Sequence, residues 1–268
     1  MAEKDTKNQI KDMIEAVPEE LSKLEVQKTA EGEVIIEQKP KFSRREKRED
    51  EDAKKALASW VPKTALGRLV KEGKIKKFDD IVASGKKILE AEIVDTLIPL
   101  ESDLLLVGQS KGKFGGGKRR AWRQTQRKTM EGNVVTFSCM AVVGDKKGHV
   151  GIGYGKSKET LPSRAKALRN ARLNVIKVTL GFETEEQKGS EAHTVPFVVE
   201  GKCGSIRIKL IPAPRGTGLV IGDEGKKVLR LAGIKDVYAV TKGQTRTTFN
   251  IAKAIIDALK KTNQEILK

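Results

Sequence analysis

Two stretches of the sequence are rich in basic side chains and glycines, residue types that can contact phosphate groups. Residues 108–130 hold eight Lys or Arg and no Asp or Glu, with Trp122 among them. Cationic side chains pair with phosphate oxygens, and aromatic rings stack on unpaired bases. Eight unopposed cations repel one another unless anions neutralise them, which favours a polyanionic partner over a merely soluble loop. The candidate RNA-binding residues of this stretch are Lys111, Lys113, Lys118, Arg119, Arg120, Trp122, Arg123, Arg127 and Lys128.

A second candidate site is a strand in which every other residue is glycine. Val150, Ile152 and Tyr154 alternate with glycines at 151, 153 and 155, after a turn at 144–148. Because glycine weakens a strand, this run indicates that something approaches the backbone closely. Cations follow at once, so we expect the approaching object to be a polyanion, although packing within the chain remains open. The candidate contacts here are Lys156, Lys158, Arg164 and Arg169.

The sequence offers little for catalysis. Gly155-Lys156-Ser157 has the end of a Walker phosphate loop, but Val150 stands where the first glycine belongs. Gly216 and Gly218 before a predicted helix are weak support for a small-molecule phosphate site. The two histidines and two cysteines make no zinc pattern, and we expect surface or backbone-bonded histidines and buried, reduced thiols. We therefore expect no enzyme, no metal and no cofactor.

Charge and hydrophobicity divide the chain into an extension and a compact remainder. Residues 1–59 hold 13 Lys/Arg and 15 Asp/Glu, whereas residues 60–268 hold 40 and 21, for a net charge of +17 over 268 residues. The excess positive charge indicates an anionic partner. No membrane span or signal-peptide pattern is present, and the reduced thiols fit a cytosolic compartment. We expect the extension to be helical or disordered, with a short apolar island at 34–36.

The remainder has the pattern of an α+β protein. A helical lead-in segment at 60–107 contains helices near 66–70, at 78–83 and at 90–97. Residues 108–180 are expected to form a basic loop, three antiparallel strands (124–129, 134–143, 150–155) and a helix. The apolar stripe predicted for that helix comprises Leu161, Ala165, Leu168, Ala171 and Val175.

An acidic linker at 181–192 precedes a second α+β domain at 193–262 and a tail at 263–268. This domain is expected to open with a hairpin (197–202 and 205–211). A helix from Asp223 to Ala232, ended by Gly233, leads to a strand at 236–241. The stripe Phe249, Ala252, Ile256 and Leu259 predicts a last helix capped by Thr247 or Thr248.

Several long motifs together resemble one protein family. The run Val143 to Glu159, centred on His149-Val-Gly-Ile-Gly-Tyr-Gly155, is similar to the signature of the universal fifth protein of the small ribosomal subunit. Residues 60–75, 193–197 and 203–218 resemble its archaeal and eukaryotic branch, and residues 231–237 and 243–248 also fit. The resemblance covers residues 60–262, and several independent motifs make it specific.

The resemblance implies a fold and a role. It implies a β-β-β-α domain like the double-stranded-RNA-binding fold, then an α+β domain with a left-handed crossover. The implied role is a structural one: binding rRNA and supporting subunit assembly and decoding accuracy where mRNA enters the subunit, with mRNA as a further partner. Implied neighbours are the fourth and eighth small-subunit proteins. Arg215 would contact rRNA, and the interface with the fourth protein would include Gly216, Thr217, Gly218, Leu219 and Gly222.

The chain departs from the family at the first β-turn, which is commonly basic there. Here the turn at 129–135 contains Glu131 and no base. We hypothesise that the long basic stretch at 108–127 replaces part of the missing rRNA contact. Two other functions remain as alternatives: a free-standing RNA-binding regulator that uses only the β-β-β-α unit, and a small-molecule phosphotransferase that binds nucleotide around residues 216–225.

Overall fold

The computed structural model describes residues 24–28, 34–38, 59–109, 119–182 and 192–264. The chain forms two compact units, Met1–Ser59 and Trp60–Lys268. In the first, β1 (Leu24–Lys28) and β2 (Val34–Gln38) form an antiparallel pair. The apolar island at 34–36 therefore belongs to a strand, where the periodicity indicated no element. The apolar residues with helical spacing run from 10 to 24; Leu24 lies in β1 and not in a helix, and the others, like the mixed-charge run at 41–55, lie outside the described residues.

The lead-in segment forms the three predicted short helices, α4 (Ala65–Lys71), α5 (Phe78–Ala83) and α6 (Ala91–Leu97). They share a small core around Val70, Phe78 and Ile93. The buried carboxylate of Glu90 joins them, because its Oε1 accepts the backbone N–H groups of Lys63 and Thr64 at 2.9 and 2.6 Å. These donors lie just before α4, so a residue at the start of α6 satisfies them.

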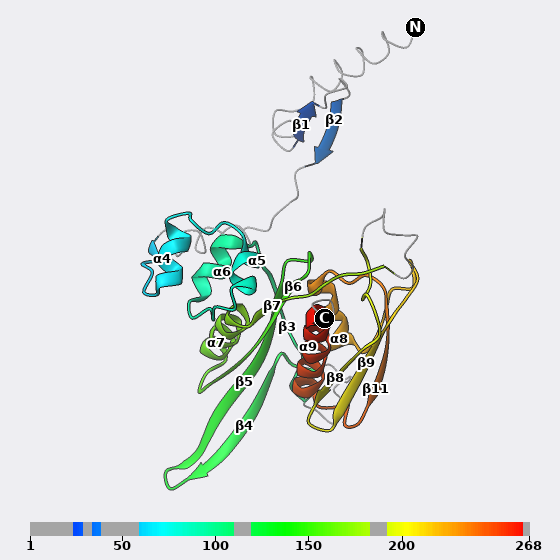
Figure 1. Cartoon of the computed structure of the whole chain (residues 1–268). Helices are drawn as coiled ribbons and strands as arrows, with labels where there is room; N and C mark the ends of the chain where they lie inside the picture. Colours follow the sequence, from blue (N-terminus) through cyan, green and yellow to red (C-terminus); the bar gives the residue numbers. More distant parts are fainter. Residues whose placement is uncertain (1–23, 29–33, 39–58, 110–118, 183–191, 265–268) are drawn as a thin grey trace, which may run out of the picture. The chain divides into compact units, whose positions relative to one another are not determined.

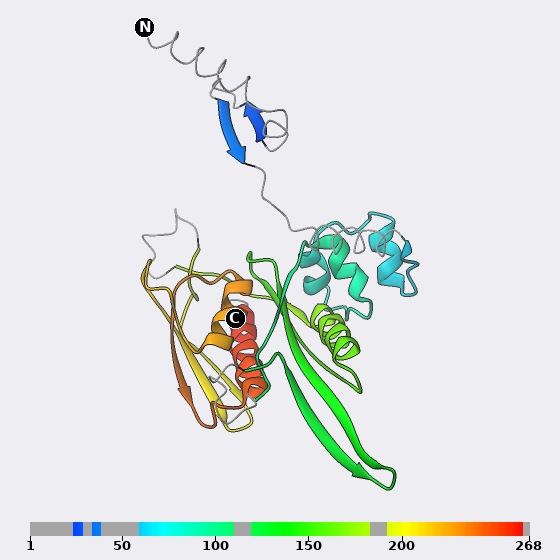
Figure 2. The same cartoon turned by 180° about the vertical axis from the view of Figure 1, so that it is seen from behind.

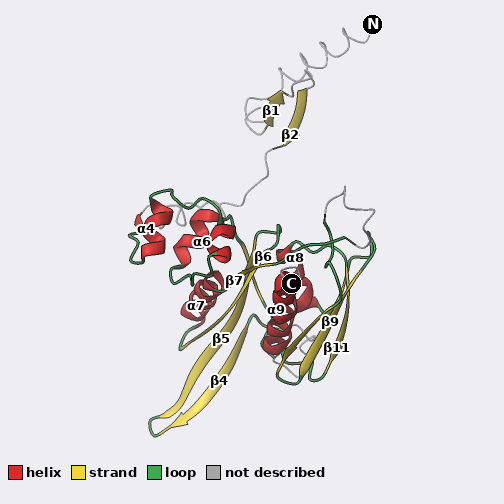
Figure 3. Cartoon of the chain, viewed as in Figure 1, coloured by secondary structure: helices red, strands yellow, loops and turns green. Residues whose placement is uncertain are grey.

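The three predicted antiparallel strands are confirmed as β4 (Trp122–Thr129), β5 (Gly132–Gly144) and β6 (His149–Ser157). Two short strands that periodicity did not indicate extend the sheet: β3 (Glu101–Leu104) pairs with β5, and β7 (Val175–Lys177) pairs with β6. The β4–β5 hairpin projects well beyond the rest of the sheet (Figures 1 and 3).

The glycine face of β6 packs against α7 (Thr160–Leu173), so the object that approaches this backbone is a helix and not a polyanion. A Cβ atom added at Gly153 would lie 2.1 Å from the Ala171 nitrogen and 2.2 Å from the Ala167 oxygen. The predicted apolar stripe of this helix was also wrong in part. The buried face carries Ser163, Ala167 and Ala171, because a close approach needs small side chains, while Leu161 is 72% exposed.

The second sheet has the strand order β10-β11-β9-β8. The predicted hairpin is confirmed as β8 (Val199–Cys203) and β9 (Ile206–Pro212), and the later strand as β11 (Val237–Lys242). Helix α8 (Asp223–Ala232) ends at Gly233, which has a φ of 91°, as predicted. Helix α9 (Thr248–Gln264) buries Ala252, Ile256 and Leu259 of the predicted stripe. A two-residue strand, β10 (Leu219–Val220), pairs in parallel with β11.

The helices α8 and α9 lie between the two sheets, and α7 covers the other face of the first sheet (Figure 2). One apolar core therefore contains residues of both sheets, such as Met140 and Val142 of β5 with Ile208 and Leu210 of β9. Whether residues 108–180 and 193–262 act as separate domains stays a prediction. Among the described helices, none is long and apolar enough to cross a membrane.

Candidate nucleic-acid interface

Strand β4 carries most of the described cations of the predicted basic stretch, and its pairing divides them between two sheet faces. Arg123 lies opposite Ser138, which lies opposite Lys156 of β6. Directly opposite residues in antiparallel strands share a face, and alternate residues of one strand do too. Arg123, Arg127 and Lys156 are therefore on one face, all three exposed. Lys128 lies on the face that α7 covers.

Trp122 is on the α7 face, opposite Cys139, which lies opposite Gly155. Its ring has two guanidinium groups close by: Arg164 of α7 at 5.3 Å and Arg120 at 5.9 Å from the ring centre. Cation–π contacts of this kind stabilise a partly buried ring and hold the arginines in place. The structure thus brings together three predicted RNA-binding residues, with the indole in contact with arginine.

The other candidate cations are dispersed. Lys158 and Arg169 are exposed, on the turn after β6 and on α7. The Nη1 of Arg119, an exposed residue, instead donates to Thr248 Oγ1 at 3.3 Å, so this arginine contacts α9 of the same chain. Arg172, on the basic side of α7, forms an ion pair with Asp95 of α6 at 3.0 Å. Lys111, Lys113 and Lys118 lie outside the described residues.

The predicted protein-interface loop joins β9 to α8. Arg215 and Gly216 are exposed at its tip, and Gly216 and Gly218 have φ values of 84° and 74°. The loop is held in place because the Gly218 N–H donates to Asp236 Oδ1 at 2.7 Å. Leu219, in contrast, packs against the shared core, so its side chain is partly withdrawn from any partner.

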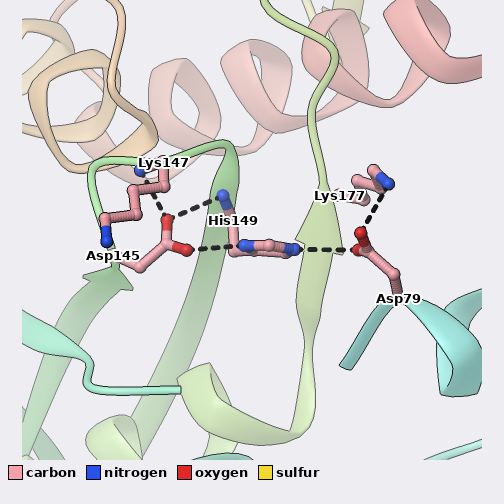
Figure 4. A network of polar contacts seen from close by, with 5 residues as sticks. All are labelled: Asp79, Asp145, Lys147, His149 and Lys177. Atoms are coloured by element: carbon pink, nitrogen blue, oxygen red, sulfur yellow. Dashed lines mark hydrogen bonds and ion pairs between the residues drawn. The ribbon is translucent and has the colours of Figure 1, made fainter. Parts of the chain in front are cut away.

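A polar network around His149 joins the lead-in helices to the first sheet (Figure 4). His149 Nδ1 lies 2.6 Å from Asp145 Oδ2, and its Nε2 lies 3.1 Å from Asp79 Oδ1 on α5. Asp79 also accepts a hydrogen bond from Lys177 Nζ of β7 at 2.8 Å. The sequence predicts a surface or backbone-bonded histidine at 149, because Asp79 is distant in sequence and no local motif predicts the contact between the two side chains.

The pKa values of this network shift as expected for an imidazolium between two carboxylates. The hydrogen bond to Asp145 raises the pKa of His149, against the opposing effect of burial. Burial alone would raise the pKa of Asp145, but hydrogen bonds from His149 and from the Lys147 N–H outweigh it and lower the pKa. The hydrogen bond from Lys177 lowers the pKa of Asp79. The network is therefore a structural clasp, and no pair in it resembles a nucleophile with its base.

Comparison with known proteins agrees with this architecture. The family model described as ribosomal protein S5, N-terminal domain, matches residues 121–179, and the one described as ribosomal protein S5, C-terminal domain, matches residues 201–265. The first match covers β4 to β7 with α7, and the second covers the α8–α9 half.

Proteins named small ribosomal subunit protein uS5 from three archaea are similar over most of their length. The Nanoarchaeum equitans protein is 48% identical over 206 residues, which are 76% of this chain and 88% of the relative. The Thermofilum pendens protein is 48% identical over 76% of this chain and 95% of the relative. The Methanospirillum hungatei protein is 45% identical over 77% and 94%. The chain belongs to the uS5 family of small ribosomal subunit proteins.

Proposed function

We propose that this protein is a structural component of the small ribosomal subunit that binds rRNA and catalyses no reaction. The observation that carries the proposal is the exposed row of Arg123, Arg127 and Lys156 across β4 and β6, in a chain of net charge +17. Phosphates bound there would neutralise cations that otherwise repel one another. As a component of the ribosome, the protein would act in the cytoplasm.

The two faces of the β4–β5–β6 sheet would have different roles in rRNA binding. The face with Arg123, Arg127 and Lys156 contacts rRNA phosphates directly. On the other face, Arg120 and Arg164 each contact the Trp122 ring, so these residues present cations in a fixed position and contribute shape more than base stacking. Lys128, Lys158 and Arg169 add phosphate contacts at the edges, and Arg215 contributes one from the C-terminal half.

We further propose that the loop at 212–222 forms a protein–protein interface, with the fourth small-subunit protein as the partner and the eighth as another neighbour. The adjacent face of the second sheet supports a protein contact there. Val220, Tyr238 and Ile211 form one row across β10, β11 and β9. Val220 and Tyr238 are 47% and 41% exposed. Through this interface the protein would support subunit assembly and decoding accuracy where mRNA enters.

Co-sedimentation of the full chain with small subunits tests the proposal. We expect stoichiometric association and tight binding to archaeal small-subunit rRNA that weakens steeply with salt. A free-standing regulator would instead leave the subunit fraction, and either that outcome or salt-insensitive binding would contradict the proposal.

The phosphotransferase alternative predicts nucleotide binding near the start of α8. A cavity of about 570 Å³ lies there, but Asp223 and Glu224 are among its lining residues and their charge disfavours a triphosphate. Equilibrium dialysis with ATP is expected to show no binding, and saturable binding would revive this alternative.

A further inference from the structure

We propose that a groove between α7 and α9 is a second RNA-binding site, which takes an unpaired nucleotide of the rRNA. The inference rests on the proposed function and adds a site that the cationic sequence motifs do not contain. The groove has a volume of about 500 Å³. Its lining comes from β5, β6, α7, β8 and α9, and includes Tyr154, Asn170, Lys202, Lys253, Asp257 and Lys260.

Tyr154 supplies an aromatic ring at a fixed position. Tyr154 is 42% exposed, although it lies within β6 of the first sheet. The Phe249 ring of α9 meets it edge to face, with ring centres 5.4 Å apart and an angle of 74° between the planes. The strand below is fixed as well, because Asn170 Nδ2 donates to the Tyr154 carbonyl oxygen at 2.8 Å. A rigid, partly exposed ring suits stacking on a nucleic-acid base.

Three lysines line the same groove as this ring. Lys202 of β8 and Lys253 and Lys260 of α9 line the groove, and all three are exposed. Asp257 is the acidic residue of the lining, and it is already engaged within the protein. Its Oδ2 accepts the Lys202 N–H at 3.0 Å and lies 3.6 Å from Lys261 Nζ. The groove therefore presents net positive charge next to an aromatic platform, which are the two features of single-strand binding.

The position of the groove favours RNA over a protein segment. Tyr154 and Lys156 are two residues apart on β6, so they share a sheet face. Lys156 lies opposite Ser138, which lies opposite Arg123, so a row of residues runs across the sheet from Lys156 to Arg123. A strand of RNA whose phosphates follow this cationic row would reach the groove without leaving the face. The duplex part of the rRNA would contact the row, and an unpaired nucleotide would enter the groove.

The test compares binding of full-length variants to a single-stranded RNA of about ten nucleotides and to an RNA duplex of about 16 base pairs. We expect Tyr154→Ala to weaken single-strand binding roughly 5- to 100-fold, since one lost base stack has that effect. Duplex binding should stay unchanged, and Tyr154→Phe should bind like the natural chain. The matched control is Leu89→Ala, which truncates an exposed apolar residue of the lead-in segment, far in sequence from the groove; it should leave both affinities unchanged.

A second variant leaves the contact between the Tyr154 and Phe249 rings in place. Lys253→Gln with Lys260→Gln changes exposed side chains, and it should lower the salt slope of single-strand binding by about 1.4, at 0.7 for each phosphate contact. Unchanged single-strand binding in both this variant and Tyr154→Ala would overturn the proposal, while rRNA binding by the natural chain would still support the proposed function. If the natural chain did not bind rRNA, the proposed function itself would be wrong.

Crosslinking decides between the two kinds of occupant. A photoreactive residue placed at Asn174, which also lines the groove, should crosslink to rRNA in assembled small subunits. A crosslink to a ribosomal protein in its place would overturn the proposal.

Discussion

Single residues decide how closely the helix and sheet of the β-β-β-α unit can approach. Gly151, Gly153 and Gly155 leave space that the backbone of α7 occupies, and Ala167 and Ala171 complete the contact. The alternation of glycine predicts a close approach correctly, because bare backbone has little other use in a strand. The glycine pattern does not show what approaches the strand, because a helix backbone and a phosphate group can both use the space that the missing side chains leave.

Gly153→Ala should therefore destabilise the protein severely. The new Cβ would overlap backbone atoms of α7, which cannot rotate away as a side chain could. We expect a loss of about 3 kcal/mol or more in the free energy of unfolding, at the upper end for overpacking. Gly222→Ala is the matched control, because nothing lies within 4 Å of its added Cβ and its φ is −59°. Urea unfolding of both variants measures the difference, and an equal loss would contradict this account of α7.

The clasp at His149 should give the stability a particular pH dependence. A raised pKa for His149 means that its contribution is complete below the unfolded value of about 6.5 and is lost as pH rises through the folded pKa. The lowered pKa values of Asp145 and Asp79 keep the carboxylates ionised until the pH falls below about 3.9. The clasp is thus strongest between about pH 4 and 6.5.

His149→Gln isolates this effect. The stability lost in the variant should be about 1 kcal/mol larger at pH 5.5 than at pH 8.5, a modest value because the Asp79 side chain is 45% exposed. Urea unfolding at the two pH values measures it. A loss that is independent of pH would show that the imidazole acts only by its shape.

At the scale of elements, the helices and the longer strands of residues 60–268 were predictable, and the shortest strands were not. The glycine at 233 marks the end of α8 because only glycine adopts its φ of 91° easily. Strands β3, β7 and β10 are two to four residues long, so they have no period to detect, and pairing with a longer neighbour defines them. The candidate site was predictable in residue type, but only the register of β4 shows which cations share a face.

Helix α4 depends on a carboxylate from outside its own sequence. Burial raises the pKa of Glu90, yet the hydrogen bonds from Thr64 and Lys63 outweigh it and lower the pKa, so the buried group is ionised. Glu90→Gln should cost about 1–2 kcal/mol, because hydrogen bonds to an ionised acceptor are about twice as strong. Hydrogen exchange at the Lys63 and Thr64 amides should quicken. Glu72→Gln, which removes an exposed pair with Lys74, should change the stability by less than about 0.5 kcal/mol.

At the scale of the molecule, α8 and α9 have an apolar neighbour on both sides. Val228 and Leu229 of α8 and Ile255 of α9 belong to the same core as Met140 and the second sheet. Periodicity could not predict that both sheets share this core. It shows that a helix face is apolar, but it does not show which element covers that face. The acidic stretch predicted as a linker at 181–192 thus joins two halves that share one core.

A fragment of residues 193–268 should therefore be much less stable than residues 60–268. Removal of the first sheet would expose the faces of α8 and α9 that now pack on β5 and β6. We expect residues 60–268 to unfold in one transition and the fragment to aggregate or bind a hydrophobic dye. A cooperative transition in the isolated fragment would instead support two separable domains.

The central claim is that the row of cations on β4 and β6 binds rRNA phosphates. The most direct test is the salt dependence of binding to archaeal small-subunit rRNA by the natural chain and by the variant Arg123→Gln, Arg127→Gln and Lys156→Gln. These side chains are exposed, so the variant should fold normally. We expect the slope of log K against log salt to fall by about three, near one for each lost phosphate contact. An unchanged slope would contradict the claim.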